Sequence, residues 1–464
     1  MSLTPLLELL GSHLLLAVGF TMAAILMASI LTERRPTGST FAWLLAIIFI
    51  PYIGVPLFLV FGGRKLKKRA AEKEKLYAGP SAPDARGGDV ARVLCSLGAP
   101  PPTTGNDAEL LVDGEAAYAA VIEALRSAKT SIHLSTLIFA DDEVGRAVGD
   151  VLCEKARAGV EVRVLIDAFF KFRSSRRQMS ELVRAGAKVA WFMPVWHLPF
   201  RGNANLRLHR KTVTVDDRLT ILGGMNVARE YMGPAPLEGR WRDLSARITG
   251  RAVRDVARIF VADWRFASGE KLAPPADDGA GGEANGGAEI QVVGSGPDVE
   301  GDLLYDAFLS AIYEARRRLW IATPYFVPDD ALTRAIVLAV RRGVDVRVVV
   351  PARSNHLTAD LAGATYLRQI ARAGGKVACY GPGMMHAKLV LADDALGVLG
   401  SANMDMRSLF LDYEIALFFS SKGQIDALDA WFRARLFPAC SDLRPAGKAR
   451  AMIETLARLV APLE

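Results

Sequence analysis

Cysteine is scarce in this sequence, and this scarcity excludes some classes of protein. The 464 residues include four cysteines, at positions 95, 153, 379 and 440, and no two of them form a C-x-x-C motif. The sequence therefore shows no disulfide framework of the kind found in small secreted proteins, and it fits a reducing compartment. A chain of this length exceeds what one hydrophobic core usually serves, so we expect two domains or a duplicated unit.

The chain also has little net positive charge outside one short segment. The net charge is +7, but residues 64–75 hold seven basic and two acidic residues and so supply five of these charges, which leaves +2 for the rest. A nuclease needs basic charge along a groove, so the charge pattern argues against nucleic acid as a partner.

Two long apolar runs stand at the N-terminus, at about residues 12–31 and 40–62. Each is long enough to span the hydrocarbon layer of a bilayer. Glu8 occupies the place of a basic n-region, which disfavours a cleaved signal peptide. Pro51, Gly54 and Pro56 predict a kinked or partly re-entrant second segment, and whether it crosses fully is left open.

The basic segment at 64–75 follows the second apolar run directly. By the positive-inside rule, this segment places the rest of the chain on the cytoplasmic side of the membrane, as part of a multi-pass protein. The same cations are expected to attract an anionic phospholipid bilayer.

The remaining sequence divides into two similar halves in which helical and strand patterns alternate, which is typical of α/β folds. We expect the apolar segments in residues 1–63, a basic juxtamembrane segment and linker at 64–108, a first repeat at 109–267, a flexible linker at 268–289 and a second repeat at 290–464. The predicted fold is two fused repeats, each a mixed sheet flanked by helices, around a pseudo-twofold site.

One motif, H-x-K-x-x-x-x-D, occurs once in each half. The copies consist of His209, Lys211 and Asp216, and of His386, Lys388 and Asp393. Each is followed by a corner of small residues that ends in Asn226 or Asn403, with Ser401 in the second corner. A single H-x-K would carry little weight, but two copies with matching tails indicate a functional site.

Histidine and lysine two residues apart on a strand project from the same face. Together with Asn226, Asn403 and Ser401 they predict a phosphate-binding site that needs no metal and no cofactor. If the halves face each other, one histidine can attack phosphorus while the other protonates the departing oxygen, and Lys211 and Lys388 stabilise the charge.

Each histidine also needs a carboxylate to fix its tautomer. Asp243 follows His209 by 34 residues and Glu414 follows His386 by 28, so we expect each to orient the histidine of its own repeat. Asp216 and Asp393 belong to the catalytic motif, although we expect them to stabilise a hairpin turn rather than contact substrate.

The paired motif resembles that of the phospholipase D superfamily, and the chain is similar to bacterial cardiolipin synthases over almost its whole length. The segments that carry this likeness are Asn205–Lys211, Gly223–Asn226, Trp241–Asp243, Thr323–Asp329 and Gly400–Ser408. The resemblance implies metal-independent transfer of a phosphatidyl group from one phosphatidylglycerol to another, with release of glycerol. It implies a phosphohistidine intermediate, on His209 by the usual assignment. Ser245 and Asn355 depart from the residues common in such relatives.

Three alternatives remain beside this hypothesis. The first is a phospholipase D-type hydrolase, or a transphosphatidylase that uses another alcohol as acceptor, because the shared motif does not define the acceptor. The second is a nuclease, which the charge pattern disfavours. The third is an inactive lipid-binding protein, which would be expected to have lost one of the motifs. Acyl-chain preference and oligomeric state, including a homo-oligomer, are left open.

Overall fold

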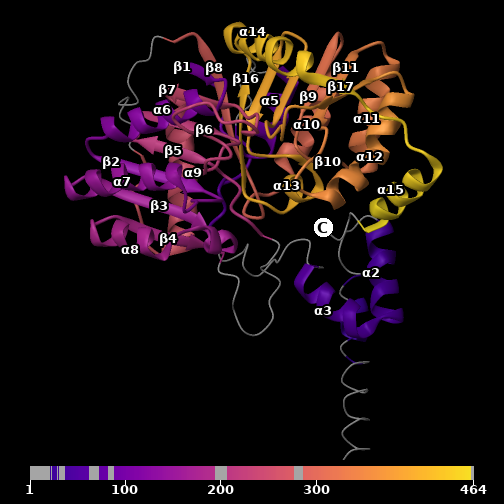
Figure 1. The fold of residues 1–464 in the computed structure, drawn as a ribbon, viewed down its shortest axis with the longest axis horizontal. Coiled ribbons are helices and arrows are strands. Elements are labelled where there is room, and N and C mark those ends of the chain that lie inside the picture. The colour runs from indigo at the N-terminus through magenta and orange to yellow at the C-terminus, as the bar shows by residue number, and fades with distance from the viewer. Residues whose placement is uncertain are drawn as a thin grey trace, which may run out of the picture.

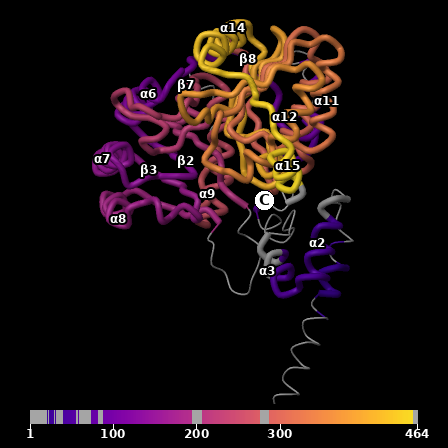
Figure 2. Tube along the Cα trace, turned by 45° about the vertical axis from the view of Figure 1, so that its right-hand side comes forward, coloured from indigo at the N-terminus to yellow at the C-terminus, as the bar shows by residue number. Residues whose placement is uncertain are grey.

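The computed structural model describes residues 21–30 apart from 22 and 29, then 37–61, 73–81, 88–193, 206–275 and 286–460. Within this part of the chain, 15 strands form one mixed sheet with helices packed against it (Figure 1). The tube in Figure 2 shows the two halves side by side, the first coloured indigo to magenta and the second orange to yellow. The predicted α/β class is confirmed.

Both halves have the same strand order when read outward from the centre of the sheet. The order is β1-β7-β6-β5-β2-β3-β4 in the first half and β8-β16-β14-β13-β9-β11-β12 in the second, with β17 added at its edge. The halves join where β1 pairs antiparallel with β8. The duplication in the sequence therefore appears in the structure as two repeats with the same strand order, which confirms the expected two repeats.

The strands of the first half are β1 (Thr103–Leu111), β2 (Ser131–Thr136), β3 (Glu161–Asp167), β4 (Lys188–Phe192), β5 (Thr212–Val215), β6 (Leu219–Gly223) and β7 (Ser245–Thr249). Those of the second are β8 (Ala288–Ser295), β9 (Arg318–Ala322), β11 (Asp345–Pro351), β12 (Lys376–Tyr380), β13 (Leu389–Ala392), β14 (Leu396–Gly400), β16 (Glu414–Phe419) and β17 (Cys440–Asp442). Short strands β10 (Phe326–Val327) and β15 (Met404–Asp405) pair separately.

The helices cover the sheet because each buries an apolar stripe. In α7 (Glu143–Arg157), Asp142 caps the first turn by accepting from Val144 N and Gly145 N, and Val148 and Leu152 face the core at helical spacing. The other helices of the two repeats are α5 (Gly88–Ser96), α6 (Gly114–Ser127), η2 (Phe169–Arg173), α8 (Arg176–Arg184), α9 (Ala252–Ser268), α10 (Leu303–Glu314), α11 (Asp330–Arg341), α12 (Leu357–Arg372), α13 (Met406–Phe410), α14 (Lys422–Trp431), η4 (Phe432–Leu436), η5 (Phe437–Ala439) and α15 (Lys448–Val460).

Both expected linkers are in part built into the folded body, which corrects the expected boundaries. Helix α5 and most of β1 fall within 64–108, and Lys73 of this segment is buried. At the start of 268–289, Glu270 binds Arg163 and Lys188. Residues 276–285, where we expect flexibility, lie outside the described residues.

The N-terminal region contains α2 (Thr37–Phe49) and α3 (Pro51–Phe61), which fold back on each other. The rings of Trp43 and Phe58 meet edge to face, 5.2 Å apart. The break between the helices at Ile50 agrees with the predicted kink, because Pro51 cannot continue the hydrogen bonding of α2. Much of the first apolar run, including residues 12–20, lies outside the described residues. None of the described helices is both long enough and apolar enough to cross a membrane.

Candidate active site

Each motif histidine is held by a short backbone pairing with the other repeat. In the first half, Leu208 forms a parallel bridge with Tyr413. His209 N donates to Tyr413 O at 3.0 Å, and Tyr413 N donates to Arg207 O at 2.9 Å. His209 therefore lies directly beside Glu414, the first residue of β16.

The second half repeats this arrangement. Arg242 bridges to Met385, His386 N donates to Arg242 O at 2.7 Å, and Arg242 N donates to Met384 O at 2.8 Å. This pairing places His386 beside Asp243. The two histidines thus come to one site at the junction of the repeats, as the sequence predicts.

The carboxylates are exchanged between the repeats, so our assignment of each to the histidine of its own repeat is wrong. His209 Nδ1 donates to the Glu414 carboxylate, 2.8 Å from Oε1, and His386 Nδ1 lies 2.7 Å from Asp243 Oδ2. Both carboxylates are fully buried. Counting residues along the chain could not reveal the exchange, because it follows from backbone bridges between distant segments.

The two carboxylates have different surroundings. Ser401 Oγ donates to Glu414 and accepts from Ile415 N, and its residue is fully buried. The prediction that Ser401 binds phosphate is therefore corrected, because its hydroxyl is already used to hold a carboxylate. Gly224 occupies the matching corner of the first repeat, where a Cβ atom would lie 2.5 Å from Asp243 Oδ2.

These surroundings give the two histidine–carboxylate pairs different proton affinities. Burial alone would raise the pKa of Glu414, but His209 and Lys211 lower it overall, and burial lowers the pKa of His209. This pair is therefore a neutral imidazole beside an ionised carboxylate at neutral pH.

The pair formed by Asp243 and His386 retains a proton more readily. Burial raises the pKa of Asp243 to about 7, while burial and the charge of Lys388 lower the pKa of His386 well below its ordinary value. One proton is therefore taken up by the pair as a unit near neutral pH. A carboxylate that titrates near the working pH beside a histidine is typical of an acid–base group.

The motif lysines are buried at the same site. Lys211 Nζ donates to His209 O at 2.5 Å, and Lys388 Nζ lies 2.8 Å from His386 Nδ1. Burial lowers the pKa of Lys211 to about 7 and that of Lys388 to about 8. An anionic ligand would offset this burial and restore both charges, so the site favours an anion over a neutral molecule.

The two asparagines also stand at the site as predicted. Asn226 Oδ1 accepts from Ile138 N at 3.2 Å, whereas Asn226 Nδ2 and Asn403 Oδ1 are buried polar atoms without a hydrogen-bond partner in the described chain. Buried polar groups normally have partners, so the Asn226 Nδ2 amide is suited to donate to a phosphate oxygen, whereas Asn403 Oδ1 can only accept.

The motif aspartates bind backbone at the edge of the repeats. The Asp216 carboxylate accepts from the backbone N–H groups of Lys129, Thr130 and Ser131, at 2.7–2.9 Å. The Asp393 carboxylate accepts from the backbone N–H groups of Arg316, Arg317 and Arg318. Their geometry fits the expected turn-stabilising role.

Replacement of Asp216 by Asn is therefore expected to weaken folding and to spare activity. An amide has one acceptor oxygen for several N–H donors, so the free energy of unfolding should fall by about 1.5 kcal/mol and Tm by roughly 1–2 °C. Thermal melts and turnover at low temperature would measure both effects. Asp217→Asn is the matched control, and a large loss of turnover without loss of Tm would contradict the structural role.

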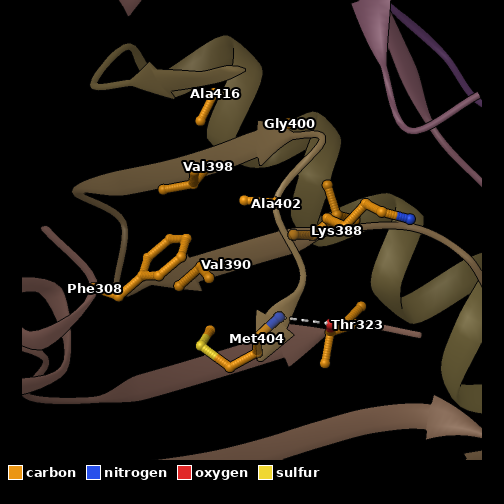
Figure 3. Close-up of a pocket in the computed structure, with 11 residues that line it drawn as sticks. Phe308, Thr323, Lys388, Val390, Val398, Gly400, Ala402, Met404 and Ala416 are labelled. Carbon is orange, nitrogen blue, oxygen red and sulfur yellow. Dashed lines mark hydrogen bonds between the residues drawn. The ribbon is translucent and has the colours of Figure 1, made fainter. Parts of the chain in front are cut away.

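An apolar pocket lies behind the second motif lysine. It is lined by Phe308, Val390, Val398 and Met404, and the Lys388 ammonium points away from these side chains (Figure 3). Its cavity of about 10 Å³ has room for little more than one water molecule. A phospholipid is therefore too large to bind in this pocket.

Several residues of the site were assigned no role from the sequence, although Trp241 belongs to a segment that carries the family likeness. The rings of Tyr231 and Trp241 lie 5.1 Å from that of His386. Beside His209, Arg210 is fully buried and its guanidinium binds both oxygens of Asp263. Arg210 stands between His209 and Lys211 in the motif, so its local sequence gave no signal of a buried carboxylate partner.

Comparison with known proteins agrees with this geometry. The family described as cardiolipin synthase, PLD-like domain, matches residues 121–264 and 308–436, and the phospholipase D-nuclease N-terminal family matches residues 21–63. The chain is 33% identical over 418 residues to the probable cardiolipin synthase YwiE of Bacillus subtilis, covering 87% of this chain and 83% of that protein. It is also 33% identical over 425 residues to the cardiolipin synthase of Alkalihalophilus pseudofirmus, covering 86% and 83%.

A solved structure shows the same fold. The phosphatidylserine synthase of Haemophilus influenzae superimposes with a TM-score of 0.58 at 17% identity, covering 85% of this chain and 97% of that one. Two repeats that each bring a His–Lys pair to a common site define a protein of the phospholipase D superfamily. Within it, the chain belongs to the family of phospholipase D-like cardiolipin synthases.

Proposed function

We propose that this protein is a cardiolipin synthase that joins two phosphatidylglycerol molecules and releases glycerol. The observation that carries the proposal is the pair of motif histidines, His209 partly buried and His386 buried, each fixed by a carboxylate of the other repeat and accompanied by a lysine. Such a site supplies one nucleophile, one acid–base group and two cations for a phosphodiester. The curated relatives named as cardiolipin synthases support the choice of substrate.

In the first step, His209 Nε2 attacks the phosphorus of the first phosphatidylglycerol. Glu414 holds Nδ1 and its proton, so the lone pair on Nε2 is free to react. The bond from phosphorus to the glycerol oxygen breaks, and His386 gives that oxygen a proton as glycerol leaves. The product of this step is a phosphatidyl group on His209.

In the second step, a hydroxyl of another phosphatidylglycerol replaces the imidazole. His386 takes the hydroxyl proton, the oxygen bonds to phosphorus, and the bond to His209 breaks. Cardiolipin is released and both histidines return to their starting protonation. Lys211 and Lys388 neutralise charge on the non-bridging oxygens in both steps, and Asn226 and Asn403 complete the phosphate site.

The different proton affinities support this division of roles. The pair of His209 and Glu414 is deprotonated at neutral pH and suits a nucleophile, whereas the pair of His386 and Asp243 takes up a proton near pH 7 and suits the acid. Pseudo-symmetry alone would permit the reverse order, so the chemical asymmetry is what favours His209.

The enzyme is further proposed to be held at the cytoplasmic face of a bacterial inner membrane by its N-terminal region. The apolar runs and the basic residues that follow them support this placement. On α2, Phe41, Leu45 and Phe49 are exposed in the isolated chain, as expected of a helix surrounded by lipid.

The test is a product analysis. Purified protein in detergent is incubated with phosphatidylglycerol as sole lipid, with a chelator present, and the products are resolved. Cardiolipin and glycerol in equal amounts are the expected result. Phosphatidic acid alone would instead indicate a hydrolase, and turnover only after another alcohol is added would indicate a transphosphatidylase with a different acceptor.

A further inference from the structure

The C-terminal helix α15 turns its apolar side chains away from the protein. Met452, Ile453 and Leu456 are 64%, 51% and 57% exposed, although they lie on one side of the helix at helical spacing. Helix α7 has a comparable apolar stripe and buries it in the core. The stripe on α15 therefore lacks the cover that an apolar helix face normally has.

The orientation of α15 is fixed by charge. Glu454 is 1% exposed, and its carboxylate accepts from Arg368 Nε at 2.8 Å and Nη2 at 2.9 Å, on α12. Arg450 also donates to it, at 2.9 Å. On the last turn, Arg458 lies over the ring of Tyr366. Because Glu454 lies on the side opposite the stripe, these contacts hold the apolar residues outward.

The surface around the stripe carries positive charge. Arg444 and Lys448 are exposed, and Arg450 is exposed but pairs with Glu454, the sole acidic residue of α15, which is buried on the opposite side of the helix. An apolar stripe flanked by exposed cations on a helix is the pattern of a helix that lies in the headgroup region of an anionic bilayer.

The position of α15 agrees with this pattern. In both Figure 1 and Figure 2, α15 lies on the side of the body that faces α2 and α3. Those helices expose Phe41, Phe49 and Ile53, at 60%, 74% and 58%. The exposed apolar groups of the chain's N-terminal helices and of its C-terminal helix are therefore found toward the same side.

We propose that α15 is an interfacial helix that docks the catalytic body on the anionic bilayer holding its substrate. The inference rests on the proposed function, since the substrate lipid lies in that bilayer. Through Arg368 and Glu454, α15 fixes the second repeat to the surface, so the body cannot swing freely on its N-terminal segments. A second copy of this chain is the alternative occupant of the stripe.

The first test measures the depth of the stripe without turnover. Full-length protein with an environment-sensitive dye at Ile453→Cys is placed in vesicles of phosphatidylglycerol and phosphatidylethanolamine that contain nitroxide-labelled lipid. The control is Ala119→Cys on α6, an exposed site in the other half of the sheet. Labelled protein without either substitution corrects for the native cysteines.

We expect a blue-shifted dye at 453 that labelled lipid quenches at least severalfold more than the dye at 119. Equal, weak quenching at both sites would overturn the proposal. A blue-shifted dye at 453 that lipid does not quench, and whose shift depends on protein concentration, would indicate a second copy and would also overturn it.

The second test separates docking from chemistry. Met452, Ile453 and Leu456 are replaced together by Gln, which retains helix propensity. The control, Thr455→Gln, adds a Gln to the same helix at an exposed polar position outside the stripe. In vesicles, the triple variant should need several times more phosphatidylglycerol in the surface for half-maximal rate, with kcat unchanged, and in detergent micelles it should match the control.

An equal loss of kcat in micelles and vesicles would contradict docking and point to damage in the site. An error in the proposed function can be told apart from an error in the docking proposal. In the former case the unsubstituted protein would form no cardiolipin in micelles, while lipid quenching at 453 would still report whether α15 meets the bilayer.

Discussion

His209→Ala and His386→Ala are each expected to lower cardiolipin formation by about 10³-fold or more, since the two histidines act as one unit. Because the carboxylates are exchanged, Glu414→Gln should reproduce the defect of His209→Ala, and Asp243→Asn that of His386→Ala. The carboxylate variants should lose about 10²- to 10⁴-fold, as expected when a histidine loses the group that fixes its tautomer.

An activated substrate separates the two kinds of defect. With p-nitrophenol in place of glycerol, the leaving group departs without a proton. His386→Ala and Asp243→Asn should then release about one equivalent of p-nitrophenol per site in a rapid burst. His209→Ala and Glu414→Gln should release none, because they lack a competent nucleophile.

Two outcomes would contradict these expectations in different ways. A burst from His209→Ala but not from His386→Ala would reverse the roles of the histidines. Glu414→Gln that behaves like His386→Ala would contradict the exchange of carboxylates itself.

The pH dependence gives an independent measurement of the same pairs. The pair formed by His386 and Asp243 must hold a proton to release glycerol, and the pKa of Asp243 is raised to about 7. We therefore expect kcat/KM to fall as pH rises through about 7. In Asp243→Asn the proton must reside on His386, whose pKa burial keeps low, so the alkaline limb should move to lower pH.

Lys73→Met is expected to cost about 3–5 kcal/mol in the free energy of unfolding, as found when one partner of a buried ion cluster is removed. Lys73 is 3% exposed and binds Asp263 and Asp298, the latter at 2.7 Å. Arg210 binds the other side of Asp263, so two cations and two anions share one buried cluster. Without Lys73, one carboxylate remains buried without a partner.

A variant that restores the charge balance of the cluster distinguishes this explanation from a simple loss of packing. The double variant Lys73→Met with Asp298→Asn removes one charge of each sign and should recover more than half of the lost stability. Lys75→Met is the control, because Lys75 pairs with Glu300 at the surface, where an ion pair contributes little. A Lys73→Met protein as stable as Lys75→Met would contradict the cluster's role.

The same cluster determines how the stability lost in Lys73→Met depends on pH. Burial alone would raise the pKa of Asp298, but the charges of Lys73 and Arg210 lower it overall. That stabilisation is present above the ordinary aspartate pKa and is lost as pH falls through the folded value. The loss in free energy of unfolding caused by Lys73→Met should therefore be largest near neutral pH. It should become smaller in acid, where Asp298 becomes protonated.

This cluster also connects the basic segment to the active site. Arg210 follows His209 directly, and its Nε donates to Glu414 O at 3.0 Å. Lys73 lies 4.5 Å from the ring of Tyr413, which precedes Glu414. Lys73→Met should consequently reduce turnover at temperatures where the protein is still folded, and Lys75→Met should not.

The duplication and the α/β class could be predicted from the sequence, and so could the motif residues that we propose as the reacting groups. These features are local: His209 and Lys211, or His386 and Lys388, share a face because they are two residues apart, and the strand and helix patterns of each repeat can be recognised in its own periodicity. The turn-stabilising role of Asp216 was also predictable, since it stands at the end of a strand pattern beside a second acidic residue.

Three features could be seen only in the folded chain: which carboxylate binds which histidine, where Lys73 lies and which way the apolar side of α15 faces. Each depends on contacts between segments far apart in the chain, and sequence spacing carries no information about such contacts. In the sequence Lys73 is one cation among seven, and only the folded chain brings Asp263 and Asp298 to it, from 190 and 225 residues away. Likewise the apolar stripe of α15 resembles a core-facing stripe, and it is the buried contact of Glu454 with Arg368 that turns it outward.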